Sequence, residues 1–306
     1  MNNNLLNVNL ADLRLSNPTV LASGILGYSG DSLIAVQENG AGAVITKSVG
    51  VSPRPGYPNP TVVQAQGGLI NAVGLPNPGI NDYAEEITYA KSILEIPLIA
   101  SIFGYTAEEY VLVSRKAVEA GADAVELNVS CPHVQYTGSE IGQNPQLLTD
   151  VVCKVKAAIQ KPVIVKLSPN VTDVTEIAQA AEKAGADALT VINTVRAMAI
   201  DAETQRPVLS NVRGGLSGPA IKPIALRCVY DVYESVKVPV LGCGGIAHWH
   251  DAVEFFLAGS SAIQVGTAIA FEEPGLFQAI NRGVTNYLKR KGYKSVMEIV
   301  GLSHQA

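Results

Sequence analysis

Cysteine is scarce in this sequence, and the few cysteines stand far apart. Four occur among the 306 residues, at Cys131, Cys153, Cys228 and Cys243. No two of them form the C-x-x-C pair that clips zinc or an iron–sulfur cluster. A cluster of that kind would have to be carried by another chain. In a reducing compartment the four thiols are expected to be free.

Positive charge and long hydrophobic runs are also lacking. The 22 Lys and Arg residues are outnumbered by 27 Asp and Glu residues, which gives a formal net charge of -5 and no basic field for nucleic acid. No stretch reaches the roughly 18 apolar residues of a membrane-spanning helix. The start, MNNNLLNVNLADLRL, lacks the basic and apolar segments of a secretion signal. We therefore expect a cytoplasmic protein that binds neither nucleic acid nor membrane.

Histidine is rare as well, and its four positions show no ligand spacing joined to a carboxylate cluster. We therefore expect no catalytic metal. His248 and His250 flank Trp249 where a solvated helix start is predicted, and His304 is expected in a loose tail.

The sequence does contain a regular alternation of strand and helix patterns. Short apolar runs rich in β-branched residues predict eight strands, at 18–24, 42–48, 97–104, 123–130, 161–168, 187–194, 238–245 and 261–268. Stretches of helical period between them predict helices that include 106–121, 144–159, 173–185, 223–236 and 248–259. Thr106 followed by Glu109 is a capping-box pattern.

Eight such units favour closure into an α/β fold of the (β/α)8 TIM-barrel type, because open doubly wound sheets usually have fewer strands. No linker divides the chain, so residues 1–306 are predicted to form a single domain. Two stretches resist the pattern, 50–82 and 132–146. We expect both to be long loops that shape or cover a site.

The predicted strands share a polar residue or a glycine near the carboxyl end, at Ser23, Lys47, Ser101, Asn128, Lys166, Asn193, Gly244 and Gly266. These residues could simply cap the barrel. Burying lysines and asparagines there costs several kcal/mol unless a partner is present, which favours a ligand site. Gly244-Gly245 and Gly266-Thr267 follow strands seven and eight, where barrels commonly bind phosphate, although glycines also serve tight turns.

The cysteines divide by position. Cys131 lies in a proline-containing loop at the predicted mouth of the barrel, where nearby lysines could stabilise its thiolate, so we interpret it as reactive. Cys153 and Cys228 fit inert, core-type cysteines on helices. Cys243, beside the glycines of strand seven, stays open between the two interpretations.

Nine motifs together resemble the class 1 dihydroorotate dehydrogenases, in the order of that family and over nearly the whole chain. They are LASG (21–24), TKSV (46–49), NAVGLPNPG (71–79), ELNVSCP (126–132), VKLSPN (165–170), INT (192–194), GGLSGPA (214–220), GCGG (242–245) and VGTA (265–268). NAVGLPNPG together with NVSCP is the specific part. The glycine motifs alone would not identify the family.

The resemblance implies an FMN-dependent oxidation of dihydroorotate to orotate in pyrimidine biosynthesis. It assigns FMN contacts to Ser23, Lys47, Ser48, Asn128, Lys166, Ile192, Gly218, Gly244, Gly245, Gly266 and Thr267. It assigns the orotate site to Lys47, Asn71, Ala72, Val73, Gly74, Leu75, Asn128, Asn193 and Thr194.

The resemblance also implies the catalytic residues, Cys131 and Lys47. Cys131 corresponds to the base of the cysteine subfamily, which takes a ring proton on the side opposite the flavin. Lys166 near the flavin N1 edge would stabilise the charge of the reduced flavin. One position departs from the family, because His133 stands where Asn is frequent; it is either a substitute donor or a proton relay.

The motifs look closer to the NAD-linked subclass, in which such a chain pairs with an iron–sulfur and FAD subunit. That subclass implies a homodimer core inside a heterotetramer. The alternatives are a fumarate-using homodimer, another FMN barrel acting on a pyrimidine, such as the dihydropyrimidine dehydrogenase domain or a dihydrouridine synthase, and a non-redox phosphate-binding barrel. A dihydrouridine synthase should show a basic face, and no bulk basic charge is present.

Overall fold

The computed structural model describes residues 4–129, 141–272 and 275–305. At its centre eight strands close into a barrel in the order β10-β15-β16-β3-β4-β7-β8-β9. All neighbouring pairs are parallel. The strands are β3 (Thr19–Leu21), β4 (Ala43–Ile45), β7 (Leu98–Ile102), β8 (Ala124–Asn128), β9 (Val163–Leu167), β10 (Ala188–Val191), β15 (Val240–Cys243) and β16 (Ser260–Val265). The closed parallel barrel confirms the predicted (β/α)8 fold. That residues 1–306 form a single domain stays a prediction.

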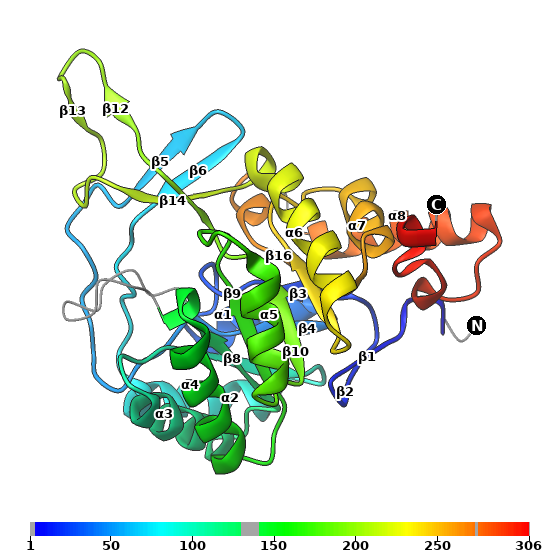
Figure 1. Cartoon of the computed structure of the whole chain (residues 1–306), viewed down its shortest axis with the longest axis horizontal. Helices are drawn as coiled ribbons and strands as arrows, with labels where there is room; N and C mark the ends of the chain where they lie inside the picture. The colour runs from blue at the N-terminus through cyan, green and yellow to red at the C-terminus, as the bar shows by residue number, and fades with distance from the viewer. Residues whose placement is uncertain (1–3, 130–140, 273–274, 306) are drawn as a thin grey trace.

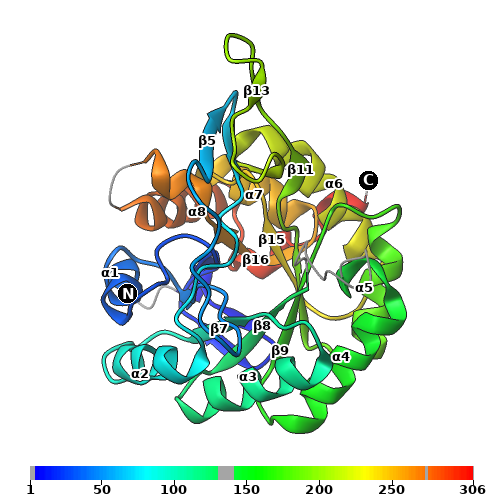
Figure 2. The same ribbon diagram turned by 90° about the vertical axis from the view of Figure 1, so that its left-hand side faces the viewer.

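Helices surround the barrel. Figure 2 shows the strands at the centre and the helices around them. They are α1 (Gly30–Glu38), α2 (Ile80–Lys91), α3 (Ala107–Glu119), α4 (Pro145–Ala158), α5 (Val174–Lys183), α6 (Lys222–Ser235), α7 (Trp249–Leu257) and α8 (Leu276–Lys291). The five helices named from periodicity are confirmed; α1, α2 and α8 are additions. None of the helices in the described ranges is long and apolar enough to cross a membrane.

The start of α3 shows how local sequence positions a helix. The Thr106 hydroxyl accepts a hydrogen bond from the Glu109 N–H at 3.2 Å, as the capping pattern predicts. The Glu109 carboxylate, however, accepts from the Tyr105 N–H at 2.6 Å instead of closing back onto Thr106. Only the Thr106 half of the predicted capping box is therefore present. The Glu109 side chain stabilises the turn before the helix instead.

The prediction of one long loop over 50–82 is wrong. This stretch contains β5 (Val62–Ala65) and β6 (Gly68–Asn71), and α2 begins inside it. With β11 (Val195–Ala197) and β14 (Gly214–Ser217) they form an antiparallel sheet in the order β11-β14-β6-β5, which we call the rim sheet. It lies outside the barrel, at the upper left of Figure 1. The second predicted loop, 132–146, falls outside the described residues up to 140, and from 141 it forms η2 (Ile141–Gln143) and the first turn of α4.

Smaller elements complete the fold. Two short hairpins pair β1 (Val8–Leu10) with β2 (Leu13–Leu15) and β12 (Ile200–Asp201) with β13 (Arg206–Pro207). The remaining 3-10 turns are η1 (Asn4–Leu6), η3 (Pro219–Ile221), η4 (Thr267–Ala270), η5 (Val296–Ile299) and η6 (Leu302–Gln305).

His304 lies in a packed tail, so the prediction of a loose end is wrong. Its ring stacks on Tyr230 with centroids 3.7 Å apart, and its side chain is 11% exposed. Nδ1 lies 3.1 Å from a Glu234 carboxylate oxygen and Nε2 lies 3.0 Å from the Ala258 carbonyl oxygen. His248, by contrast, is an exposed residue at the start of α7, as predicted.

The helical cysteines differ from each other. Cys228 is buried in the core face of α6, which confirms its interpretation as a small apolar residue. Cys153 is exposed on α4, with its sulfur 3.5 Å from the Ala184 carbonyl oxygen, so its interpretation as a core residue is wrong. The helical period predicted that helix correctly but did not fix which side Cys153 occupies.

Candidate active site

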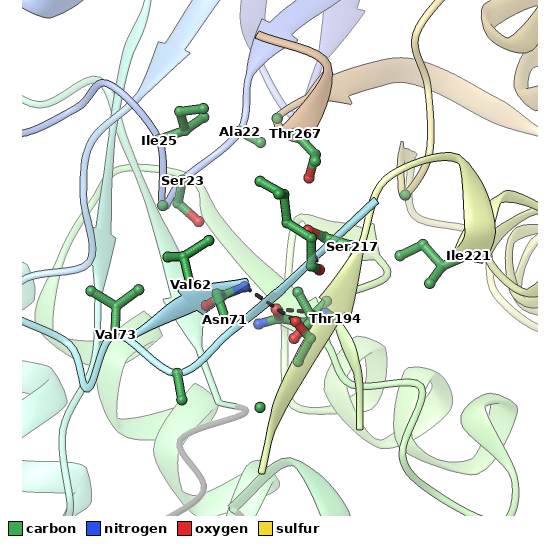
Figure 3. A pocket seen from close by; sticks show the side chains of 18 of the residues that line it. Ala22, Ser23, Ile25, Val62, Asn71, Val73, Thr194, Ser217, Ile221 and Thr267 are labelled. Atoms are coloured by element: carbon green, nitrogen blue, oxygen red, sulfur yellow. Dashed lines mark hydrogen bonds between the residues drawn. The ribbon is translucent and has the colours of Figure 1, made fainter. Parts of the chain in front are cut away.

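A cavity of about 1210 Å³ opens at the carboxyl ends of the barrel strands and extends under the rim sheet. Figure 3 shows Ser23, Asn71, Thr194 and Thr267 around it. Seven of the eight predicted strand-end residues line it; the exception is Ser101, whose buried hydroxyl lies 2.9 Å from that of Ser48. The described members of the predicted FMN and orotate sets all line this cavity: Ser23, Lys47, Ser48, Asn71, Ala72, Val73, Gly74, Leu75, Asn128, Lys166, Ile192, Asn193, Thr194, Gly218, Gly244, Gly245, Gly266 and Thr267.

Lys47 follows β4 and brings a buried positive charge to the cavity. It is 7% exposed, and its ammonium group has no hydrogen bond or ion pair with any residue that the structure describes. Its nearest aromatic contact is the Tyr28 ring, with the centroid 5.1 Å from Nζ. Burial lowers the pKa of Lys47. A buried cation in this position is suited to pair with an anionic ligand.

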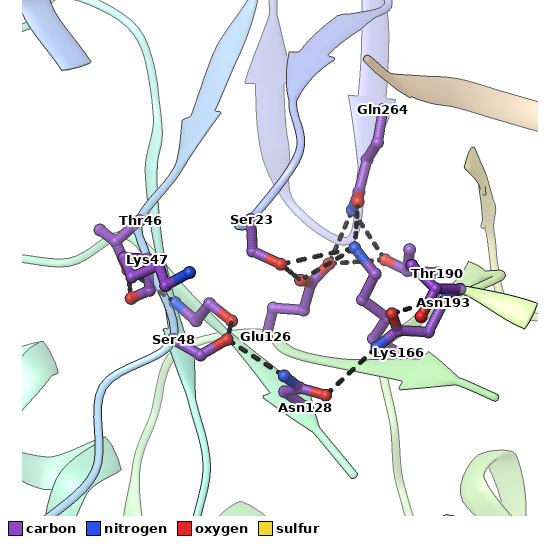
Figure 4. Close-up of polar contacts among 12 residues, drawn as sticks. Ser23, Thr46, Lys47, Ser48, Glu126, Asn128, Lys166, Thr190, Asn193 and Gln264 are labelled. Carbon is purple, nitrogen blue, oxygen red and sulfur yellow. Dashed lines mark hydrogen bonds and ion pairs between the residues drawn. The ribbon is translucent and has the colours of Figure 1, made fainter. Parts of the chain in front are cut away.

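A row of neutral polar groups crosses the floor of the cavity (Figure 4). The Asn128 amide donates to the Ser48 hydroxyl at 3.1 Å, and the Asn193 amide donates to the Asn128 side-chain oxygen at 3.3 Å. The Thr194 N–H donates to the Asn193 side-chain oxygen at 2.7 Å. These bonds fix the orientation of the amides, which offer the mixture of donors and acceptors that a pyrimidine ring requires.

A second network surrounds Lys166 on β9. Lys166 Nζ donates to Gln264 Oε1 at 2.9 Å and to the Ser23 hydroxyl at 3.4 Å. Glu126, fully buried on β8, accepts from Thr190 at 2.8 Å and from Gln264 at 2.6 Å. The sequence reasoning missed Glu126, Thr190 and Gln264. A signal was present, since a carboxylate and an amide stand in the otherwise apolar strand runs AVELN and SSAIQV.

The glycines after β15 pack against α6 at positions where no other residue would fit. Gly244 and Gly245 have φ angles of 133° and 77°, which strain any residue with a Cβ. A Cβ at Gly244 would lie 2.7 Å from that of Ala225, and one at Gly245 would lie 2.8 Å from that of Lys222. At Gly266 the nearest atom to an added Cβ is the Ala22 Cβ, at 3.3 Å. These glycines also line the cavity, so their backbone is available there to a ligand group such as a phosphate.

Cys131 and His133 lie outside the described residues, so the structure does not place the predicted base or the residue that departs from the family pattern. The structure does place Cys243, which lines the cavity beside Lys166. Burial raises the pKa of the Cys243 thiol, so this group is neutral near pH 7.

The profile of the dihydroorotate dehydrogenase family matches residues 5–288. The chain belongs to the dihydroorotate dehydrogenase family. A relative from Pyrococcus abyssi is 52% identical over 98% of this chain and 99% of its own length. Relatives from Thermococcus kodakarensis and Methanosarcina mazei are 51% and 49% identical, over 97% of this chain and 98% and 94% of their own lengths. All three are named dihydroorotate dehydrogenase B (NAD(+)), catalytic subunit.

Membership confirms the resemblance seen in the motifs and the expected class, an FMN-dependent oxidoreductase. The cavity fits that cofactor on its own evidence. It offers a glycine-lined corner for a phosphate, two buried lysines for negative charge and enough volume for a flavin with a small substrate. Gly244, Gly245, Gly266 and Thr267 would hold the phosphate, while Lys166 and Ser23 would face the remainder of the cofactor.

The glycine corner gives a first prediction. Gly245→Ala should weaken FMN binding at least about tenfold, because the added methyl collides with the Lys222 side chain and the Gly218 carbonyl oxygen. Gly292→Ala is the matched control, since Gly292 has a φ of 82° but nothing within 4 Å of an added Cβ. In both variants an alanine at a positive φ angle destabilises the folded protein by a similar amount, about 1 kcal/mol. Quenching of FMN fluorescence measures the affinity, and an equal loss in the two variants would contradict the assignment.

Proposed function

We propose that this chain oxidises dihydroorotate to orotate, with bound FMN as the hydride acceptor. The observation that carries the proposal is the cavity itself, in which a buried lysine, without an anionic partner among the residues that the structure describes, lies with oriented amides and a glycine-lined corner. Within the family this combination suits a flat, anionic pyrimidine lying against a phosphate-bearing cofactor.

Substrate binding would use the segment that follows β6. Gly74 and Leu75 both have positive φ angles, 80° and 55°. Neither backbone N–H donates a hydrogen bond to another residue of the described ranges, so both are free to receive a carboxylate. Lys47 supplies the opposite charge. The amides of Asn71, Asn128 and Asn193 would fix the ring.

The reaction needs a base. Oxidation takes a hydride from C6 and a proton from C5 of the substrate, which leaves a double bond between these carbons. We propose that the Cys131 thiolate takes the C5 proton. In sequence Cys131 stands three residues after Asn128, which ends β8 at the cavity. A free thiol has a pKa of about 8.5, close enough to neutral pH for this task.

Electrons must then leave the chain. The word subunit in the relatives' names indicates that those proteins have a partner. We propose a partner that carries an iron–sulfur cluster and FAD and passes electrons to NAD, with two copies of each chain in a heterotetramer. The absence of a C-x-x-C pair in this sequence supports placing the cluster on another chain. We also propose a cytoplasmic location, which the four widely spaced cysteines support.

The decisive experiment is anaerobic mixing of the purified protein with dihydroorotate while flavin absorbance is followed. Bleaching with formation of orotate supports the proposal. A yellow protein that bleaches with another pyrimidine but not with dihydroorotate would indicate a different FMN barrel enzyme. A preparation that stays colourless after reconstitution with FMN would favour a non-redox phosphate-binding barrel. Chromatography of the released cofactor should give FMN and no FAD, because no G-x-G-x-x-G fingerprint opens a βαβ unit.

The choice of electron acceptor yields a second prediction. The isolated chain should reduce artificial dyes with dihydroorotate but should not reduce NAD. Addition of the iron–sulfur and FAD subunit should restore NAD reduction. Fumarate is the informative control acceptor: reduction of fumarate by the isolated chain at the rate seen with dyes would replace this proposal with the fumarate-using subclass.

A further inference from the structure

Glu126 and Lys166 form a buried ion pair under the cavity. Glu126 is fully buried and the Lys166 side chain is 5% exposed, with 3.8 Å between Nζ and a carboxylate oxygen. Figure 4 shows Glu126 with Ser23, Thr190, Gln264 and Lys166 gathered around it. Lys166 lines the cavity, whereas Glu126 lies behind it and is absent from the lining. The substrate and cofactor contacts proposed above do not use Glu126.

The hydrogen bonds give the pair a fixed charge distribution. The Glu126 carboxylate accepts from the hydroxyls of Ser23 at 3.2 Å and Thr190 at 2.8 Å, and from the Gln264 amide at 2.6 Å. An ionised carboxylate, which only accepts hydrogen bonds, suits these three donors. Gln264 links the two charges, because its oxygen accepts from Lys166 while its nitrogen donates to Glu126.

The charge on Lys166 depends on its burial and on the charged groups beside it. Burial disfavours this charge, whereas the negative charge of Glu126, and that of Cys243 in the alkaline range where its thiol ionises, favours it, so that the pKa of Lys166 is raised overall. In the described part of the chain two titratable groups face Lys166, Glu126 from β8 and Cys243 from β15. The other neighbours in this network are neutral: Thr190 from β10, Gln264 from β16 and Ser23 from the segment after β3. Since the Cys243 thiol is neutral near pH 7, Glu126 is the anion that offsets Lys166.

We propose that Glu126 is a positioning residue for the reaction: it keeps Lys166 protonated and, through Gln264, directed at the cavity. The inference rests on the proposed function, in which FMN occupies the cavity beside Lys166. Without Glu126 a buried ammonium group would lose its counter-charge, and buried lysines in apolar surroundings can become neutral near or below pH 7.

The test is the pH dependence of the FMN absorbance spectrum in the reconstituted protein, from about pH 6 to 10. The wild type should show no transition that belongs to Lys166 in this range. Glu126→Gln keeps the shape of the side chain and should introduce one, with the Lys166 titration lowered by at least about two pH units. Glu126→Gln combined with Lys166→Met should abolish that transition. If the transition survives in the double variant, or if Glu126→Gln binds FMN and shows none, Glu126 does not hold the charge of Lys166.

A second measurement covers the case in which Glu126→Gln fails to fold or to bind FMN. Glu126→Asp keeps the negative charge but withdraws it by one methylene from Lys166 Nζ, so it should lower the Lys166 titration in the same direction by a smaller amount. Carbon-13 NMR of lysine labelled at Cε follows this titration in the apoprotein, with the Lys166 signal assigned by its loss in Lys166→Met. An unchanged titration in Glu126→Asp would overturn the proposal. Because this readout needs neither FMN nor dihydroorotate, it is independent of the proposed function.

Discussion

Replacing Cys131 by serine should slow flavin reduction by dihydroorotate at least about 100-fold at pH 7 while FMN stays bound. A serine hydroxyl is a far weaker base than a thiol, and a positioned base contributes about 100-fold to 10,000-fold. The rate should rise with pH and recover in part in alkaline solution. Anaerobic stopped-flow absorbance gives the reduction rate directly, separated from the later transfer of electrons.

Cys153→Ser is the matched control, because it makes the same chemical change at an exposed position outside the cavity. Its reduction rate should equal that of the wild type. An unchanged rate at pH 7 in Cys131→Ser would show that another group takes the C5 proton, and His133 would then be the first residue to replace.

Lys47→Met should abolish measurable orotate binding and yet stabilise the apoprotein. Lys47 is a buried cation without an anionic partner in the described ranges, so its removal relieves a desolvation cost of roughly 1–3 kcal/mol. The melting temperature of the apoprotein should rise by a few degrees. Lys166→Met is the control and should have the opposite effect on stability, because it leaves the buried Glu126 without its counter-charge.

The pH dependence of this stability has a definite sign. The folded state lowers the pKa of Lys47 from its ordinary value of 10.5, so the folded protein releases this proton more readily than the unfolded chain. Stability therefore rises with pH from the lowered pKa up to about 10.5. The difference in melting temperature between Lys47→Met and the wild type should shrink over that window. A variant that melts below the wild-type apoprotein at pH 7 would contradict the reasoning.

The barrel was predictable because its signals are local. Each strand is a short run of β-branched and apolar residues, and several helices carry their own caps and apolar faces, as α3 does. Parallel strands in a barrel bring their carboxyl ends together, so Lys47, Asn128 and Lys166 could be expected to meet without knowledge of the distances between them. The family motifs then supplied the assignment of each residue to cofactor or substrate.

The features that the sequence did not predict depend on partners far along the chain. Gln264 and Glu126 are 138 residues apart, and their contact across the barrel converts two odd residues in apolar strands into one network. The packed tail likewise depends on Tyr230, which receives the His304 ring. β5 and β6 escaped notice because prolines and glycines surround them and their four-residue sequences, VVQA and GLIN, do not alternate regularly between apolar and polar residues.

The rim sheet also sets the order in which a newly made chain can complete its cavity. Asn71 at the end of β6 bonds to the Gly215 carbonyl oxygen, 144 residues later in the chain. At the usual pace of translation, about 5–20 residues per second, β6 leaves the ribosome on the order of ten seconds before β14 exists to pair with it. During that interval the β6 edge of the hairpin is unpaired in addition to the outer edge of β5, and such an edge can pair with other chains. The β6 edge therefore stays open to such pairing until residues 214–217 have been added.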